Sequence, residues 1–281
     1  MQDLTQKITP WLIEHGLYIV ATITVAYIIY KFSEIVIEKF IRKIIVHDEH
    51  LDEKSEVKRE NTLIAIFTTT LRVAVLIVTV LMVLQGLGFE IGPLLAAAGI
   101  AGVALGFGGQ YLIRDLISGM FMIMENQYRI GDVVRFGDTS GTVENITLRM
   151  TTLRDLSGTV HHVPHGEISQ VSNLTKAYAR VNIDIGISYD ANLEHVISVV
   201  NKVGQELSED PEWKDSIIEA PHFLRVTDFA DSSVMIKILG DTKPQAQWSV
   251  AGEFRKRIKI AFDNEGIEIP FPQMVIHQSK L

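Results

Sequence analysis

The stretch AAAGIAGVALGFGGQ, residues 96–110, decides the fold, and five of its fifteen residues are glycine and five are alanine. It lies inside an apolar run, residues 91–124, that is long enough to cross a membrane. Each interior glycine costs a helix about 1 kcal/mol relative to alanine. A membrane helix with so many glycines therefore needs them for something other than crossing the bilayer.

On a helical wheel, the small residues of this stretch form two separate stripes. With an advance of about 100° per residue, the centres of the stripes lie about 130° apart. Small residues let membrane helices approach closely, and two different small faces favour a head-to-tail contact that closes into a ring. The interior angle of a seven-sided ring is about 129°, and six or eight subunits fit nearly as well. The stripes are Gly99, Gly102 and Gly106 on one side and Ala96, Ile100 and Ala104 on the other.

Val103 and Phe107 fall between the two stripes, one helical turn apart, so they would line the inside of such a ring. Apolar side chains in a narrow pore exclude water and thereby block ions. Leu94, Ala98 and Leu105 point the opposite way. A second interpretation stays open, in which the glycines and alanines only pack one helix inside a monomeric bundle.

Two further apolar segments, residues 11–32 and 63–87, come earlier in the chain and predict three membrane passes in all. An arginine at mid-bilayer costs at least about 2.5 kcal/mol, so we expect Arg72, which interrupts the second segment, to lie at an interface. Basic residues are concentrated between the first two segments and absent between the second and third. This distribution predicts an N-terminus outside the cell and a cytoplasmic C-terminal half. The basic residues expected to face lipid are Arg42, Lys43 and Arg72.

The third segment is too long for one straight crossing of the bilayer. Gly108 and Gly109 divide it, and residues 110–126 continue as an amphipathic helix that we expect along the inner membrane surface. Arg114 and Asp115 in this continuation are either solvated charges or partners in ion pairs, within or between subunits. The sequence leaves both interpretations open.

Composition excludes several classes of function. The formal net charge of −8 argues against a nucleic-acid partner, and the lack of cysteine excludes disulfides and thiolate chemistry. The sequence shows no catalytic motif, so we predict neither an enzyme nor a cofactor. Neighbouring strand residues point to opposite faces, so His161 and His162 do not easily share a metal, and His165 reads as part of a turn. We therefore predict no metal site.

The second half of the chain reads as two cytoplasmic domains. Short strands around glycine turns predict a small β-domain, and a β-α-β-β-α-β order predicts a ferredoxin-like domain. The closing strand carries Pro270 and Pro272, which suit an edge position. The predicted boundaries are 1–60 for the tail, first membrane helix and basic loop, 61–90 for the second helix, 91–127 for the pore-lining third helix with its continuation, 128–177 for the β-domain, 178–266 for the ferredoxin-like domain and 267–281 for the closing strand.

Four motifs make the chain recognisable. They are AAAGIAGVALGFGGQYLIRDLISG (96–119), MENQYRIGDVV (124–134), GTVENITLRMTTLRDLSG (141–158) and HHVPHGEI (161–168). In this order they resemble the small-conductance mechanosensitive channel (MscS) family, and the resemblance runs from about residue 60 to the C-terminus.

The resemblance implies a homoheptamer opened by membrane tension, with the family's two apolar pore rings at Val103 and Phe107. Leucine is common at both places, so these residues are departures, as is Ile100 where alanine is expected. The family's helix bends just after a glutamine, but Gln110 is followed here by Tyr111 rather than glycine. The candidates for the bend are Gly108, Gly109 and Gly119.

The resemblance also implies the shape of the cytoplasmic part. The β-domain would be a five-stranded SH3-like or Sm-like barrel, and residues 267–281 would supply one strand to a small β-barrel shared by all subunits. The cytoplasmic domains together would form a cage with lateral openings through which ions reach the pore.

These observations predict a mechanosensitive channel in the inner membrane of a bacterial or archaeal cell. It would release ions and small osmolytes during hypoosmotic shock. Its expected partners are membrane lipids, identical copies of the chain and the permeating ions, and no nucleic acid. The alternative is a ligand-gated channel or small-solute transporter of the same architecture, although the pore stretch lacks the buried charge and inverted repeat typical of transporters.

Overall fold

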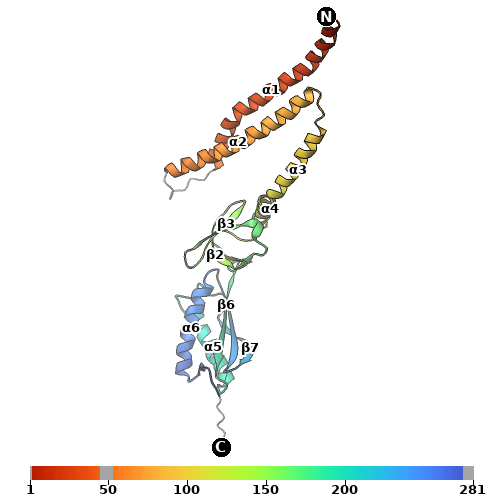
Figure 1. The fold of residues 1–281 in the computed structure, drawn as a ribbon. Coiled ribbons are helices and arrows are strands. Elements are labelled where there is room, and N and C mark those ends of the chain that lie inside the picture. Colours follow the sequence, from red (N-terminus) through yellow and green to blue (C-terminus); the bar gives the residue numbers. More distant parts are fainter. Residues whose placement is uncertain (1, 45–52, 275–281) are drawn as a thin grey trace, which may run out of the picture. The chain divides into compact units, whose positions relative to one another are not determined.

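The computed structural model describes residues 2–44 and 53–274 of the chain. The backbone divides into two compact units, Met1–Gly108 and Gly109–Leu281. The described part of the first unit holds helices only, and that of the second holds one helix followed by two sheets and two further α-helices (Figure 1).

Helices α1 (Gln2–Ile44) and α2 (Glu53–Gly86) pack side by side and run antiparallel (Figure 1). The end of α2 at Gly86 lies against Tyr18, in the first half of α1. Both helices are long and apolar enough to cross a membrane, and most of their apolar side chains are exposed. Apolar surface of this extent is stable next to lipid rather than water.

One residue, Gly109, separates helix α3 (Gly92–Gly108) from helix α4 (Gln110–Met124). If α3 and α4 count as one broken span, the described residues hold three candidate membrane crossings, the number expected from the sequence.

The β-domain is one antiparallel sheet with the strand order β4-β3-β2-β1-β5. Gly137 and Asp138 form the tight turn between its first two strands, and Gly137 takes a positive φ of 57°, which glycine adopts without steric cost. Met122 of α4 packs into the small core beneath this sheet, so α4 belongs structurally to the β-domain. The strands are β1 (Val133–Phe136), β2 (Thr139–Ile146), β3 (Met150–Arg154), β4 (Val160–Pro164) and β5 (Ser172–Asn173), and the 3₁₀ helix η1 (His165–Glu167) follows β4.

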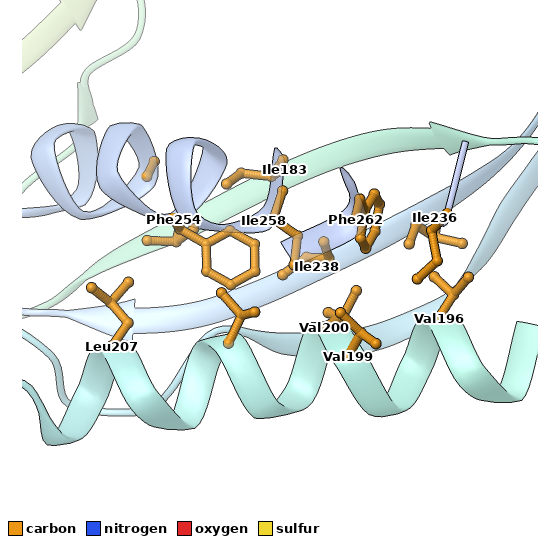
Figure 2. Packing of buried hydrophobic residues seen from close by; sticks show 14 of the residues in the cluster. Ile183, Val196, Val199, Val200, Leu207, Ile236, Ile238, Phe254, Ile258 and Phe262 are labelled. Carbon is orange, nitrogen blue, oxygen red and sulfur yellow. The ribbon is translucent and has the colours of Figure 1, made fainter. Parts of the chain in front are cut away.

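The last domain packs two helices on one face of a three-stranded sheet with the order β6-β8-β7. Alternate residues of β6 are buried, which is the period of a strand with one covered face. Figure 2 shows the core between α5 and the sheet, with Phe254, Ile258 and Phe262 entering from α6. The elements are β6 (Ala179–Ile187), α5 (Leu193–Glu209), β7 (His222–Ala230), β8 (Ser233–Thr242) and α6 (Gln247–Asn264).

Residues 267–274 form no strand within the single chain. The closing strand over residues 267–281, which the resemblance places in a barrel shared by all subunits, stays a prediction. The backbone N–H of Ser188 donates to the carbonyl of Glu268 at 3.0 Å, so this segment does lie beside the end of β6. Pro270 and Pro272 have no N–H to donate, which stops a regular ladder there. Residues 275–281 lie outside the described residues.

The fold class predicted from the sequence is otherwise confirmed. Apolar helices precede a five-stranded β-domain, and the domain after it has the β-α-β-β-α order of the ferredoxin-like fold.

Candidate functional site

Helix α3 is apolar along its whole length, and none of its residues is buried in the chain. Within residues 2–44 and 53–274, no heavy atom lies within 4 Å of the point where a Cβ would stand on Gly99, Gly102 or Gly106. These glycines therefore serve no close contact in the described chain. Packing inside a monomeric bundle does not account for them.

The residues predicted to line the pore are also exposed. Val103 is 60% exposed and Phe107 is 71% exposed. The alanine stripe, Ala96, Ile100 and Ala104, is exposed as well. Both stripes and both predicted gate residues are thus free to contact other copies of the chain.

The helix is interrupted at Gly109, between α3 and α4. Of the three bend candidates, Gly108 ends α3 and Gly109 is the interruption itself. Gly119 lies inside α4, which is continuous there. Tyr111, at the position where the resemblance implies glycine, belongs to the first turn of α4.

Asp115 on α4 is buried and binds the β-domain in two places. Its Oδ1 accepts a hydrogen bond from the backbone N–H of Gly166 at 2.9 Å. Its Oδ2 lies 3.4 Å from Nε of Arg149, which forms an ion pair. A solvated charge was therefore the wrong interpretation for Asp115, and its partner within the chain is not the neighbouring Arg114.

His165 of η1 has no exposed surface and ends a chain of hydrogen bonds beneath α4. Its Nδ1 lies 3.2 Å from the carbonyl of Leu148, which can only accept, so Nδ1 carries the proton. Its Nε2 lies 2.8 Å from the Thr151 hydroxyl, which lies 2.7 Å from the hydroxyl of Tyr128. Burial raises the pKa of Tyr128, and the hydrogen bond with Thr151 offsets this only in part.

Gly119 lets α4 approach these groups closely. A Cβ at this position would stand 2.0 Å from the carbonyl oxygen of Leu148 and 2.2 Å from Nδ1 of His165. No side chain fits in that space, so the structure gives Gly119 a packing role rather than a bend.

We expect Gly119→Ala to lower the stability of the cytoplasmic part by about 1–3 kcal/mol, the usual cost of forcing extra atoms into a packed core. Gly252→Ala on α6 is the matched control, because a Cβ there meets nothing within 4 Å and alanine favours a helix by about 1 kcal/mol. The measurement is the thermal unfolding midpoint of the solubilised protein. Equal midpoints for both variants would contradict the packing role.

Three family models match consecutive parts of the chain. They are "Mechanosensitive ion channel, transmembrane helices 2/3" over residues 69–110, "Mechanosensitive ion channel, beta-domain" over residues 111–176, and "Mechanosensitive ion channel MscS, C-terminal" over residues 181–269. A small-conductance mechanosensitive channel of Caldanaerobacter subterraneus subsp. tengcongensis is 32% identical over 256 residues, which cover 90% of this chain and 87% of that protein. The chain belongs to the MscS family of mechanosensitive ion channels.

Other relatives agree with this assignment. The moderate conductance mechanosensitive channel YbiO of Escherichia coli is 30% identical over 212 residues, which cover 75% of this chain and 29% of that protein. The Helicobacter pylori MscS structure in its closed state superposes with a TM-score of 0.74 at 20% identity, covering 96% of this chain and 99% of that one. That likeness shows that the two chains share a fold.

Two of the basic residues predicted to face lipid have protein partners in this MscS-family chain. Arg72 Nη2 lies 3.0 Å from Oε2 of Glu34, and its guanidinium carbon lies 4.4 Å from the ring centroid of Tyr30. These contacts tie α2 to α1.

Arg42 likewise pairs with Glu38 at 3.0 Å and with Glu60 of α2 at 3.2 Å. Lys43 is exposed. Sequence reasoning missed the partners Glu34 and Glu60, because the register between α1 and α2 cannot be read from either helix alone. The i,i+4 spacing of Glu38 and Arg42 was a signal that could have found the third partner.

The three histidines of the β-domain have separate partners. Nε2 of His161 lies 3.2 Å from a carboxylate oxygen of Asp155, Nδ1 of His162 lies 3.2 Å from the hydroxyl of Thr152, and His165 is buried. Within residues 2–44 and 53–274, no group of three or more metal-ligating side chains could hold an ion.

Proposed function

We propose that this protein forms a ring of identical chains in a cell membrane, with α3 around a pore that opens under membrane tension. The observation that carries the proposal is the isolation of α3. It is wholly apolar, none of its residues is buried in the chain, and a Cβ added to any of its glycines would meet nothing within 4 Å outside the helix's own backbone and chain neighbours in the described residues. Packing against identical helices would use both small stripes.

In a ring of this kind, the side chains of Val103 and Phe107 line the pore and face its axis. Two rings of apolar side chains in a narrow pore dewet, and a dry constriction does not pass ions. The angle of about 130° between the stripes favours seven chains.

Tension opens such a pore because it favours the state with the larger area in the membrane plane. The work gained is the tension multiplied by the area difference between the two states. Glycine-lined helices can tilt or slide between two packings, and the open packing moves the gate residues away from the axis. A cell under hypoosmotic shock would then lose ions and small osmolytes.

The charges of the first unit support the proposed orientation in the membrane. Basic side chains are concentrated where α1 ends and α2 begins, and no basic residue lies between α2 and α3. By the positive-inside rule, the N-terminus is outside and the second unit is in the cytoplasm.

Arg72 adds a test of how the bilayer acts on the protein. Its side chain is 30% exposed while it pairs with Glu34, so it can reach a lipid headgroup at the same time. We expect Arg72→Gln to change the opening tension, measured in excised patches, and Glu34→Gln to change it less. An unchanged opening tension in Arg72→Gln would contradict a contact between Arg72 and a lipid headgroup.

The assembly is tested by the mass of the purified protein in detergent. A ring with a mass of about seven chains supports the proposal. A monomer would contradict it.

A further inference from the structure

We propose that His165 is a positioning residue of the channel, which as a neutral ring holds α4 on the β-domain and on protonation at mildly acidic cytoplasmic pH releases it. The inference rests on the proposed function, because α4 follows directly after the pore helix in the chain. It concerns the hold on α4 and not the gate itself.

The geometry fits a neutral ring. Nδ1–H donates to the Leu148 carbonyl, and Nε2 accepts from the Thr151 hydroxyl, whose oxygen accepts in turn from Tyr128. Each of these polar groups is satisfied, as buried groups need to be. Because His165 has no exposed surface and α4 packs against its ring, water reaches the ring only when α4 moves away.

A second proton on the His165 ring reverses the direction of the hydrogen bonds from the ring to Thr151 and Tyr128. Nε2 becomes a donor, so the Thr151 hydroxyl has to turn its own proton toward Tyr128. The Tyr128 hydroxyl then has the sulfur of Met122, 3.7 Å away, as its acceptor, which is a weak one. A buried positive charge and a poorly satisfied hydroxyl both favour a state in which the ring meets water.

Some charged groups around the His165 ring favour its protonation and others oppose it. Asp115 acts on it from α4, and Arg149, from the segment before β3, pairs with Asp115. Arg114 of α4 lies beside Gly166 and is exposed, as is Glu167 of η1. Asp115 favours the protonated ring, but Arg149 and the N–H of Gly166 already bind that carboxylate.

Burial therefore dominates, and the direction of the pH effect follows. Burial lowers the pKa of His165 below its usual value, and the Leu148 carbonyl and the Asp115 carboxylate offset this only in part. A ring released into water titrates at about pH 6.5. The packed state is thus fully favoured well above about pH 6.5 and loses stability as the pH falls below it.

The test is hydrogen exchange of the α4 amides in the full-length channel in lipid nanodiscs, corrected for the intrinsic effect of pH. Between about pH 7.5 and about pH 5.5, the release equilibrium should shift by about tenfold, and exchange of residues 112–122 should rise accordingly. In His165→Asn, whose amide can still donate to Leu148 but does not titrate, the corrected rates should agree at both pH values. His162→Asn, an exposed histidine of the same sheet, should keep the wild-type response.

The exchange experiment needs no current, so its outcome is independent of the gating proposal. A wild-type channel with the same corrected rates at both pH values would overturn the role of His165, as would an unchanged response in His165→Asn. His165→Gln is the second non-titrating variant if the first fails to assemble. In patches, the opening tension of the wild type should depend on cytoplasmic pH, and that of His165→Asn should not.

Discussion

Channels carrying Phe107→Ser are expected to leak in membranes without applied tension, or to open at a much lower tension than the wild type. The hydroxyl allows water to enter the constriction, and a wet constriction conducts. Fully burying a phenylalanine side chain is worth about 1.5–3 kcal/mol, so the dry closed state loses a contribution of that order from every chain of the ring. The measurement is single-channel current in excised patches as suction increases from zero.

Leu105→Ser is the matched control for this experiment. Leu105 is 78% exposed in the chain and points away from Val103 and Phe107 on the helical wheel. The same polar change there should leave the resting current at the wild-type level. A leak in Leu105→Ser with none in Phe107→Ser would mean that the helix faces the pore with its other side.

Gly102→Leu is expected to prevent assembly of the ring while each chain remains folded. A Cβ on Gly102 meets nothing in the described chain, so a larger side chain causes no clash within one copy. Between copies it would force the glycine stripe away from the alanine stripe of the next helix. Native mass in detergent should fall from a multiple of the chain to one chain, with unchanged circular dichroism.

Ala98→Leu makes a similar small-to-large change on the outer face of the same helix, and it should still assemble. If Gly102→Leu assembles as well as Ala98→Leu, the glycine stripe is not a subunit contact. A loss of helical signal in Gly102→Leu would place the contact inside the chain, as in the monomeric bundle that the sequence left open.

The sequence predicts the elements well where the periodicity is strong. Apolar length identified the membrane helices, and alternation identified β6, whose buried residues repeat every second position. The glycine and alanine stripes were readable because one helix contains both of them. These patterns are local, so they need no knowledge of distant residues.

The sequence could not supply pairings between distant residues. Asp115 binds the N–H of Gly166, 51 positions later, and Arg72 binds Glu34, 38 positions earlier. Neither pairing leaves a local pattern. His165 was read as part of an ordinary turn because Pro164-His165-Gly166 has turn composition, and its burial depends on α4.

The closing strand has a different status, because a single chain does not test it. Its alternating apolar residues, around Ile267 and Ile269, predict a strand, but two prolines remove the N–H groups that a ladder uses. A barrel shared by several subunits would supply neighbours that one chain lacks, and that arrangement remains a prediction.

The most direct test of the account is the current through membrane patches that contain this protein alone while suction is increased. We expect stepwise currents above a reproducible tension. Silence over the whole ramp, from protein whose mass shows an intact ring, would contradict tension as the trigger. The ring would then point to a channel opened by a ligand or by voltage.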